Sequence, residues 1–204
     1  MEKTATTDAP IHDLIARRWS ARAIDPSRPV TRSQLLALLE AARWAPSCFN
    51  EQPWRYLLFD GSDELARERA WDCLLDGNSW AREAPVLLLS VARESFTRNA
   101  KPNRHAQHDV GLATENLVLQ ATHLGLATHQ MAGFDADRAR REFDIPDGFT
   151  PMAMIAVGHP ASPDVLPEDL RERELAPRTR LPLSEVVFSG GWERPHTMGE
   201  GSRP

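Results

Sequence analysis

Hydrophobic residues recur at helical and at strand spacing in alternate stretches of the chain. After Asp8, a residue that can cap a helix, apolar side chains at positions 11, 14 and 15 predict a first helix that ends near Trp19. A second helix should begin at the capping box Thr31-x-x-Gln34 and must stop before Pro46. Further helices are predicted over 62–75, over 106–124 and from Asp135 onward.

Strands are predicted where aromatic and branched apolar residues gather between turn signals. These stretches are 54–59, 86–92, 126–131 and 152–158. The stretch 86–92 is apolar on both faces, which predicts helices on each side of it. Gly125 should close the helix over 106–124 in a left-handed conformation, and the chain beyond 158, through Val187, is expected to be extended and polar. The α/β alternation predicts a sheet covered by helices.

Length and composition fit one compact domain. The chain has 204 residues, of which 41% are hydrophobic, and we expect a single domain over 1–204 with flexible tails at 1–9 and 190–204. The net charge of −5 and the pI near 5.8 argue against a nucleic-acid partner. No apolar run could cross a bilayer and the first residues lack the apolar core of a signal peptide, so we expect a cytoplasmic protein with no membrane partner. Two isolated cysteines, Cys48 and Cys73, indicate no disulfide framework.

Two pairs of arginines are candidates for an anion site. Arg18 and Arg22 lie near the start of the chain, Arg178 and Arg180 lie near its end, and apolar residues flank each pair. Guanidinium groups brought together from distant segments could neutralise a phosphate dianion, because each offers several donors in a fixed geometry. The alternative is a solvated charged face that binds no ligand.

The loop Pro46-Ser47-Cys48-Phe49-Asn50 is a second candidate. It places a hydroxyl and an amide beside prolines that restrict the backbone, which suits recognition of a polyol chain or of the edge of a heterocycle. The alternative is that serine and asparagine only satisfy local hydrogen bonds within the loop.

Other patterns argue against metal ligation and against the common nucleotide motifs. His105 and His108 match no zinc spacing, and His123 and His129 are equally isolated. The chain has no G-x-G-x-x-G, no Walker loop and no G-x-S-x-G elbow, so neither a Rossmann site nor a serine hydrolase is indicated. Gly133 gives the backbone around it the freedom to turn its amides toward a ligand.

Taken together, the ordered motifs resemble those of the nitroreductase family. The resemblance covers roughly residues 11 to 188. Its motifs are Arg18-Trp-Ser20-Ala-Arg22, Ala42-Arg-Trp-Ala-Pro46-Ser47-x-x-Asn50-x-Gln52-Pro53-Trp54, Ala84-Pro85-Val86, Gly125-Leu126, Gly133-Phe134-Asp135 and Arg178-x-Arg180-Leu181-Pro182. It implies an α+β fold, in which helices wrap a central, mostly antiparallel sheet, and an intertwined homodimer.

The resemblance also implies that flavin mononucleotide (FMN) binds at the dimer interface. The expected contacts fall into four groups. They are Arg18, Trp19, Ser20 and Arg22 with Arg178 and Arg180 at the phosphate and polar edge, Pro46, Ser47, Cys48 and Asn50 reaching in from the partner subunit, Asn78 near the pyrimidine edge, and Met131, Ala132 and Gly133 over the ring. Many members carry a glutamate where Ala132 stands and a serine where Cys48 stands, and Trp19 is also unusual.

The implied activity is transfer of electrons from NADH or NADPH, through the flavin, to a small acceptor such as a nitroaromatic or a quinone. The flavin carries the chemistry, so no side chain is expected to be catalytic. One alternative is a flavin reductase that supplies reduced flavin to a monooxygenase. A second alternative, from another class, is a binding protein that holds a phosphorylated ligand without turnover.

Overall fold

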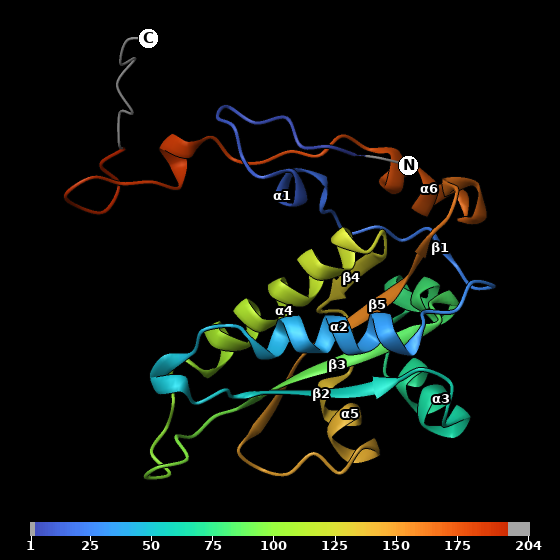
Figure 1. The fold of residues 1–204 in the computed structure, drawn as a ribbon, viewed down its shortest axis with the longest axis horizontal. Helices are drawn as coiled ribbons and strands as arrows, with labels where there is room; N and C mark the ends of the chain where they lie inside the picture. The colour runs from blue at the N-terminus through green and yellow to red at the C-terminus, as the bar shows by residue number, and fades with distance from the viewer. Residues whose placement is uncertain (1–2, 196–204) are drawn as a thin grey trace.

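The protein folds as a mixed structure of helices and strands (Figure 1). The structure is a computed structural model that describes residues 3–195. Its helices are α1 Asp13–Arg17, α2 Arg32–Arg43, α3 Glu64–Asp72, α4 Ala106–His123, α5 Ala136–Glu142 and α6 Glu168–Leu175. Its strands are β1 Ile24–Asp25, β2 Trp54–Phe59, β3 Val86–Arg93, β4 Ala127–Met131 and β5 Phe149–Pro160. Short 3-10 helices are η1 Cys48–Asn50, η2 Asp76–Glu83, η3 Pro163–Val165 and η4 Leu183–Glu185.

The strands form one sheet in the order β1-β5-β3-β2, and β4 also pairs with β5. Every pairing among these strands is antiparallel. The long strand β5 is the centre of the arrangement, because β1, β3 and β4 all bond to it. The sheet therefore confirms the α+β architecture that the resemblance implied, which the alternation of helices and strands alone did not fix.

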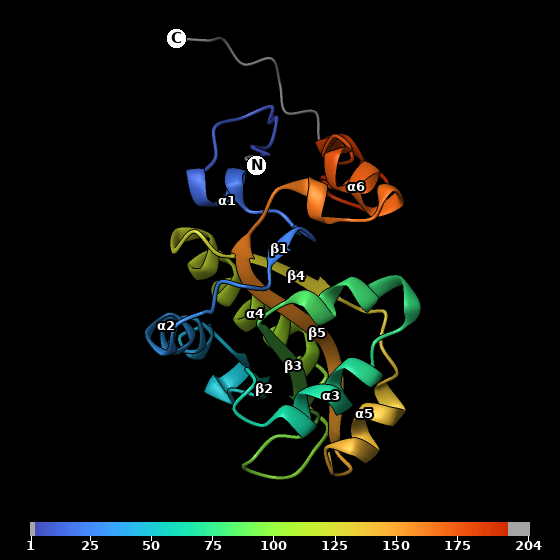
Figure 2. The same ribbon diagram turned by 90° about the vertical axis from the view of Figure 1, so that its right-hand side faces the viewer.

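Helices cover both faces of the sheet (Figure 2). On one face α2 and α4 pack over Leu88 and Ile155, and on the other α3, η2 and α5 pack over Leu89 and Met154. Seven of the eight residues of β3 are buried, which confirms the prediction that this strand is covered on each side.

Local signals in the sequence placed several elements correctly. Thr31 Oγ1 accepts from the Gln34 amide at 3.2 Å and Gln34 Oε1 accepts from the Thr31 amide at 2.9 Å, so the predicted capping box opens α2. Strand β2 has the predicted bounds. Gly125 has a φ of +71°, the left-handed conformation expected after α4.

Other expectations were wrong. The first helix is capped by His12, not Asp8, and is only five residues long. The stretch expected to be extended and polar contains α6, whose eight residues bury only Glu174 and so show no apolar stripe. The helix expected over 62–75 is shorter at both ends, because α3 begins at Glu64 and ends at Asp72. The last predicted strand extends at both ends to form β5.

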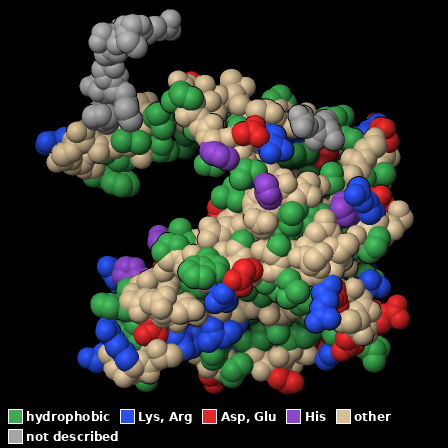
Figure 3. All heavy atoms as spheres, viewed as in Figure 1, with side chains coloured by type: hydrophobic (Ala, Val, Ile, Leu, Met, Phe, Trp, Pro, Cys, Tyr) green, Lys and Arg blue, Asp and Glu red, His purple; other side chains and the backbone are tan. Residues whose placement is uncertain are grey.

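Residues 178–195, here the C-terminal arm, run along one side of the molecule away from the sheet (Figure 1). The space-filling view shows a hollow between this arm and the body (Figure 3). Large apolar side chains of the arm face solvent. They are Leu181, Leu183, Val186 and Trp192. The expected tails fall partly at 1–2 and 196–204, outside the described residues, and their flexibility stays a prediction. Over residues 3–195, no helix combines the length and apolar character needed to span a membrane.

Candidate functional site

The predicted arginines converge on one cavity. Arg18, Arg22, Arg178 and Arg180 line a space of about 230 Å³ together with Arg173, and the remaining walls include Lys3, Trp19 and Ser20. Segments from the two ends of the chain therefore form a single basic site.

Two structural elements bring these segments together. Ser20 pairs with Thr128 of β4 in a parallel bridge, which fixes the first segment beside the sheet. Helix α6 then delivers Arg178, whose guanidinium donates to the carbonyl of Ala16 at 2.7 Å and to the carbonyl of Lys3.

Positive charge in the cavity is only partly compensated. The Arg18 guanidinium lies 3.7 Å from Glu115, whose side chain is nearly half exposed, and the Arg22 guanidinium lies 4.0 Å from Glu174. Burial, and then the charges of Arg18 and Arg180, hold the pKa of Arg178 below its usual range. An anion in this cavity would relieve that repulsion.

A second corner of the site joins Asn78 to Gly133. The Asn78 amide donates to the Gly133 carbonyl at 3.0 Å, and a Cβ added at position 133 would lie 2.5 Å from Asn78 Nδ2. Only glycine leaves room for this contact, because heavy atoms do not approach so closely. Met131 is buried and Ala132 is exposed, so the described segment presents a methyl group and backbone at its surface.

Strand β4 links the two corners. Thr128 bonds to the segment of Ser20, and Ala132 follows Met131, the last residue of the strand. Four residues of extended chain cover about 13 Å. A spacing of this size suits an elongated ligand with an anion at one end and a polar ring at the other.

Sequence reasoning missed His129 as part of this neighbourhood. Its ring lies 4.9 Å from that of Trp80, and its Nδ1 donates to the Ala21 carbonyl at 3.2 Å. Burial, and then the charge of Arg22, lower the pKa of His129 to about 4. The imidazole is therefore neutral near pH 7 and supports the Arg22 segment as a hydrogen-bond donor, a role that an isolated histidine in the sequence does not signal.

The loop of Pro46, Ser47, Cys48 and Asn50 lies elsewhere. Its η1 turn is tied to the first turn of α4, where Asp109 Oδ2 accepts from the Cys48 amide at 2.9 Å. Ser20 pairs with Thr128, beyond the other end of α4, and the 14 residues after Asp109 in that helix rise about 21 Å. Both ribbon views place η1 and α1 far apart, so one chain does not bring this loop to the arginine cavity (Figures 1 and 2).

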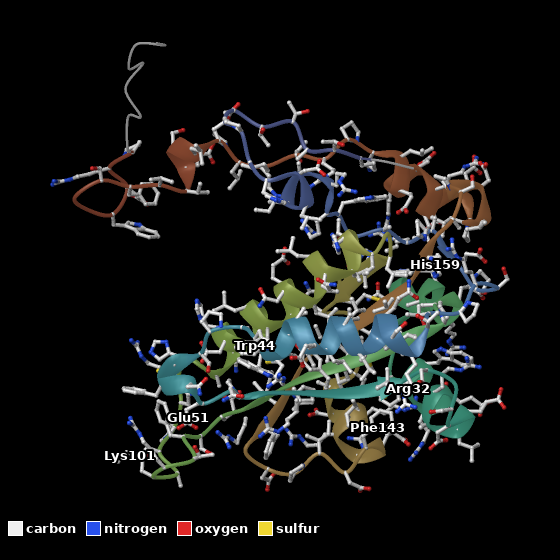
Figure 4. The ribbon with its side chains drawn as sticks, in the orientation of Figure 1. Arg32, Trp44, Glu51, Lys101, Phe143 and His159 are labelled. Atoms are coloured by element: carbon white, nitrogen blue, oxygen red, sulfur yellow. The ribbon has the colours of Figure 1, made fainter. Side chains whose placement is uncertain are left out.

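The same loop is held in a strained but well-anchored conformation. Phe49, Asn50 and Gln52 all have positive φ, between 48° and 56°. Glu51 Oε2 accepts from the Arg93 guanidinium at 2.7 Å and from the Thr97 amide at 2.8 Å. Figure 4 shows Glu51 at one end of the molecule and His159, close to the segment of Arg22, at the other. Such anchored strain is typical of a loop shaped for binding.

Metal-binding side chains do not gather in the described residues. No group of three or more histidine, cysteine, aspartate or glutamate residues between positions 3 and 195 could hold an ion. His108 lies beside Asp109, at 3.3 Å, and the pair has no third ligand in this part of the chain.

Comparisons with known proteins show which sequences and structures this chain is similar to. The sequence pattern of the nitroreductase family matches residues 15–79 and 75–159. A crystal structure described as an oxidoreductase containing FMN is 38% identical, covers 93% of this chain and 96% of its own, and superposes with a TM-score of 0.86. A 15.4 kDa protein of Mycolicibacterium smegmatis is 38% identical over 67% of this chain and 90% of its own. A putative NADH dehydrogenase/NAD(P)H nitroreductase of Streptomyces coelicolor is 28% identical over 75% and 87%.

Proposed function

The chain belongs to the nitroreductase family, and on that basis we propose that it passes electrons to a small planar acceptor, such as a nitroaromatic or a quinone, at a site shared by two copies of the chain. It is an oxidoreductase that uses FMN as its cofactor and NAD(P)H as its electron donor. The convergence of five arginines on one cavity is the observation that carries the assignment.

The donors in the cavity fit the phosphate end of FMN. Arg18, Arg22, Arg178 and Arg180 would hold the phosphate, and the Ser20 hydroxyl could donate to it. Few carboxylates neutralise these guanidinium groups in the described residues, so a dianion would find uncompensated charge.

The Asn78–Gly133 corner fits the ring end. The side-chain amide of Asn78 offers both donor and acceptor atoms to the polar edge of a heterocycle, and Gly133 lets the backbone approach the ring face. When bound, FMN would accept hydride from a reduced nicotinamide and pass the electrons on to the acceptor.

The side chains around the cavity would bind and orient the flavin, and the buried His129 is not expected to exchange protons near pH 7. The imidazole of His129 is neutral, with its Nδ1 proton held by the Ala21 carbonyl. Ala132 carries no titratable group. The open, uncharged surface at Ala132 favours a flat, neutral acceptor rather than a cationic one.

Two observations support a shared site. The loop of Ser47, Cys48 and Asn50 is rigid and shaped for binding but lies far from the arginines of its own chain. The C-terminal arm exposes apolar side chains and leaves a hollow beneath it (Figure 3). A second copy that fills the hollow would cover the arm and bring its own loop to the site.

The function is tested by anaerobic absorption spectra of the FMN-loaded protein before and after addition of NADH or NADPH. Bleaching of the flavin bands is expected, and a flavin that neither nucleotide bleaches would reject the proposal. Arg180→Gln should weaken FMN binding about tenfold. The matched control is Arg32→Gln, which removes an exposed arginine from α2 and should leave binding unchanged (Figure 4).

The shared site is tested by mixing two defective variants. Arg18→Ala with Arg180→Ala damages the arginine side of every site, and Ser47→Ala with Asn50→Ala damages the loop side. If each site draws on two chains, a mixed dimer regains one intact site, so bound FMN should rise on mixing. No gain on mixing, once exchange of subunits is verified by mass, would show that each site lies within one chain.

A further inference from the structure

The single buried residue of α6 is an acid. Glu174 is 1% exposed, while the two leucines and the other charged residues of the helix are more exposed. Burial of a carboxylate is unfavourable unless hydrogen-bond donors surround it. The hydrogen-bond partners of Glu174 therefore show which segment this helix positions.

Those partners are backbone amides of the arginine segment. Glu174 Oε1 accepts from the amides of Arg22 and Ala23, both at 3.0 Å, and Oε2 accepts from the Arg22 amide at the same distance. The bonded segment carries Arg18, Ser20 and Arg22, and α6 itself leads directly into Arg178 and Arg180. One carboxylate thus joins the two halves of the cavity.

The geometry keeps the Arg22 side chain available. The Arg22 guanidinium lies 4.0 Å from Glu174 Oε2, which is too long for a hydrogen bond, so its donors are not used by this acid. Lys3 donates to the Glu174 carbonyl at 2.6 Å rather than to its carboxylate. Glu174 therefore acts on the backbone and does not replace the anion expected in the cavity.

We propose that Glu174 is a positioning residue for the phosphate end of the site, and that its buried carboxylate gives the protein its preference for FMN over riboflavin by fixing the two arginine segments around one cavity. The inference rests on the proposed function, in which that cavity takes the phosphate. Riboflavin has the same ring and lacks the phosphate, so it reports on the ring corner alone.

Glu174→Gln keeps the size of the side chain and replaces one acceptor oxygen with an NH₂ group that cannot accept from the amides. Loss of positioning should raise the dissociation constant for FMN about tenfold and leave that for riboflavin within about twofold. Loss of a negative charge alone would have the opposite sign, because it would strengthen phosphate binding. Both constants can be measured by quenching of flavin fluorescence at fixed ionic strength.

Glu172→Gln is the matched control, because it removes the same charge from an exposed position of the same helix and should change neither constant. If Glu174→Gln does not fold, Glu174→Asp keeps the charge and withdraws the oxygens by about 1.5 Å, and it should weaken FMN selectively. Equal weakening of FMN and riboflavin, or tighter FMN binding, would overturn the inference. A wild-type protein that binds neither flavin would instead overturn the proposed function beneath it.

Discussion

Replacing Gly133 with alanine should weaken FMN binding clearly while lowering the stability of the fold only slightly. The new Cβ would lie 2.5 Å from Asn78 Nδ2, so the amide must withdraw by about 1 Å to reach ordinary contact. Nδ2 is the end of a short side chain and can rotate away, which breaks its 3.0 Å bond to the Gly133 carbonyl. The stability cost is then about 1 kcal/mol, or ~2–4 °C in Tm.

The larger effect should fall on the cofactor. An Asn78 amide turned away from the ring loses about one hydrogen bond to FMN, which raises the dissociation constant roughly five- to tenfold. Fluorescence quenching measures this constant, and a thermal scan at fixed protein concentration measures Tm. Gly77→Ala is the control, because a Cβ there meets nothing within 4 Å. Asn78→Ala should match Gly133→Ala, and the double variant should be no worse. Wild-type affinity in Gly133→Ala would refute the reasoning.

Three further predictions concern stability and reactivity. The pKa of His129 is lowered to about 4 by burial and Arg22, so the unfolded chain binds more protons between about pH 6.5 and 4, and stability is full above that window and falls within it. Between pH 7 and 4.5 the free energy of unfolding, measured with urea, should therefore fall by about 2–3 kcal/mol less in His129→Gln than in wild type. An equal fall in both proteins would contradict this. Burial raises the pKa of Cys73 to about 11, so a Cys48→Ser variant should expose no thiol to Ellman's reagent at pH 8 until it unfolds, and rapid labelling of the folded variant would count against the packing described. Leu38, on α2, is 0% exposed, and Leu38→Ala should lower the free energy of unfolding in urea by about 2–5 kcal/mol. The control is Leu36→Ala, an exposed position of the same helix, which should lower it by under about 1 kcal/mol.

Elements with local signals were predictable from the sequence. The capping box of Thr31 and Gln34 and the left-handed Gly125 each act over a few residues, so they mark the ends of α2 and α4 without reference to the rest of the fold. Helix α6 gave no such signal, because its one buried residue is a carboxylate and five of its other seven residues are charged. Hydrophobic periodicity cannot detect a helix that packs through a charge.

The site also combines residues that the sequence signals and residues that it does not. Motif order was enough to group Arg18, Arg22, Arg178 and Arg180, and the structure brings them to one cavity. The supporting residues escaped notice, since the roles of Glu174 and His129 depend on backbone groups of another segment, at Arg22 and Ala21. Contacts between distant segments leave no spacing pattern in a single sequence.

The position of β5 at the centre of the sheet has a consequence for the order of folding. Its pairing with β1 joins residues 24–25 to residues 159–160, whereas the turns of α2 and α4 each form between residues about four apart in the chain. Loop closure over so long a separation is slow, because its entropy must be lost before the contact is gained. The segment with Arg18 and Arg22 directly precedes β1, so it is fixed in place only when β1 pairs with β5. The cavity should therefore form late, after most of the chain has been synthesised and much of the core has formed.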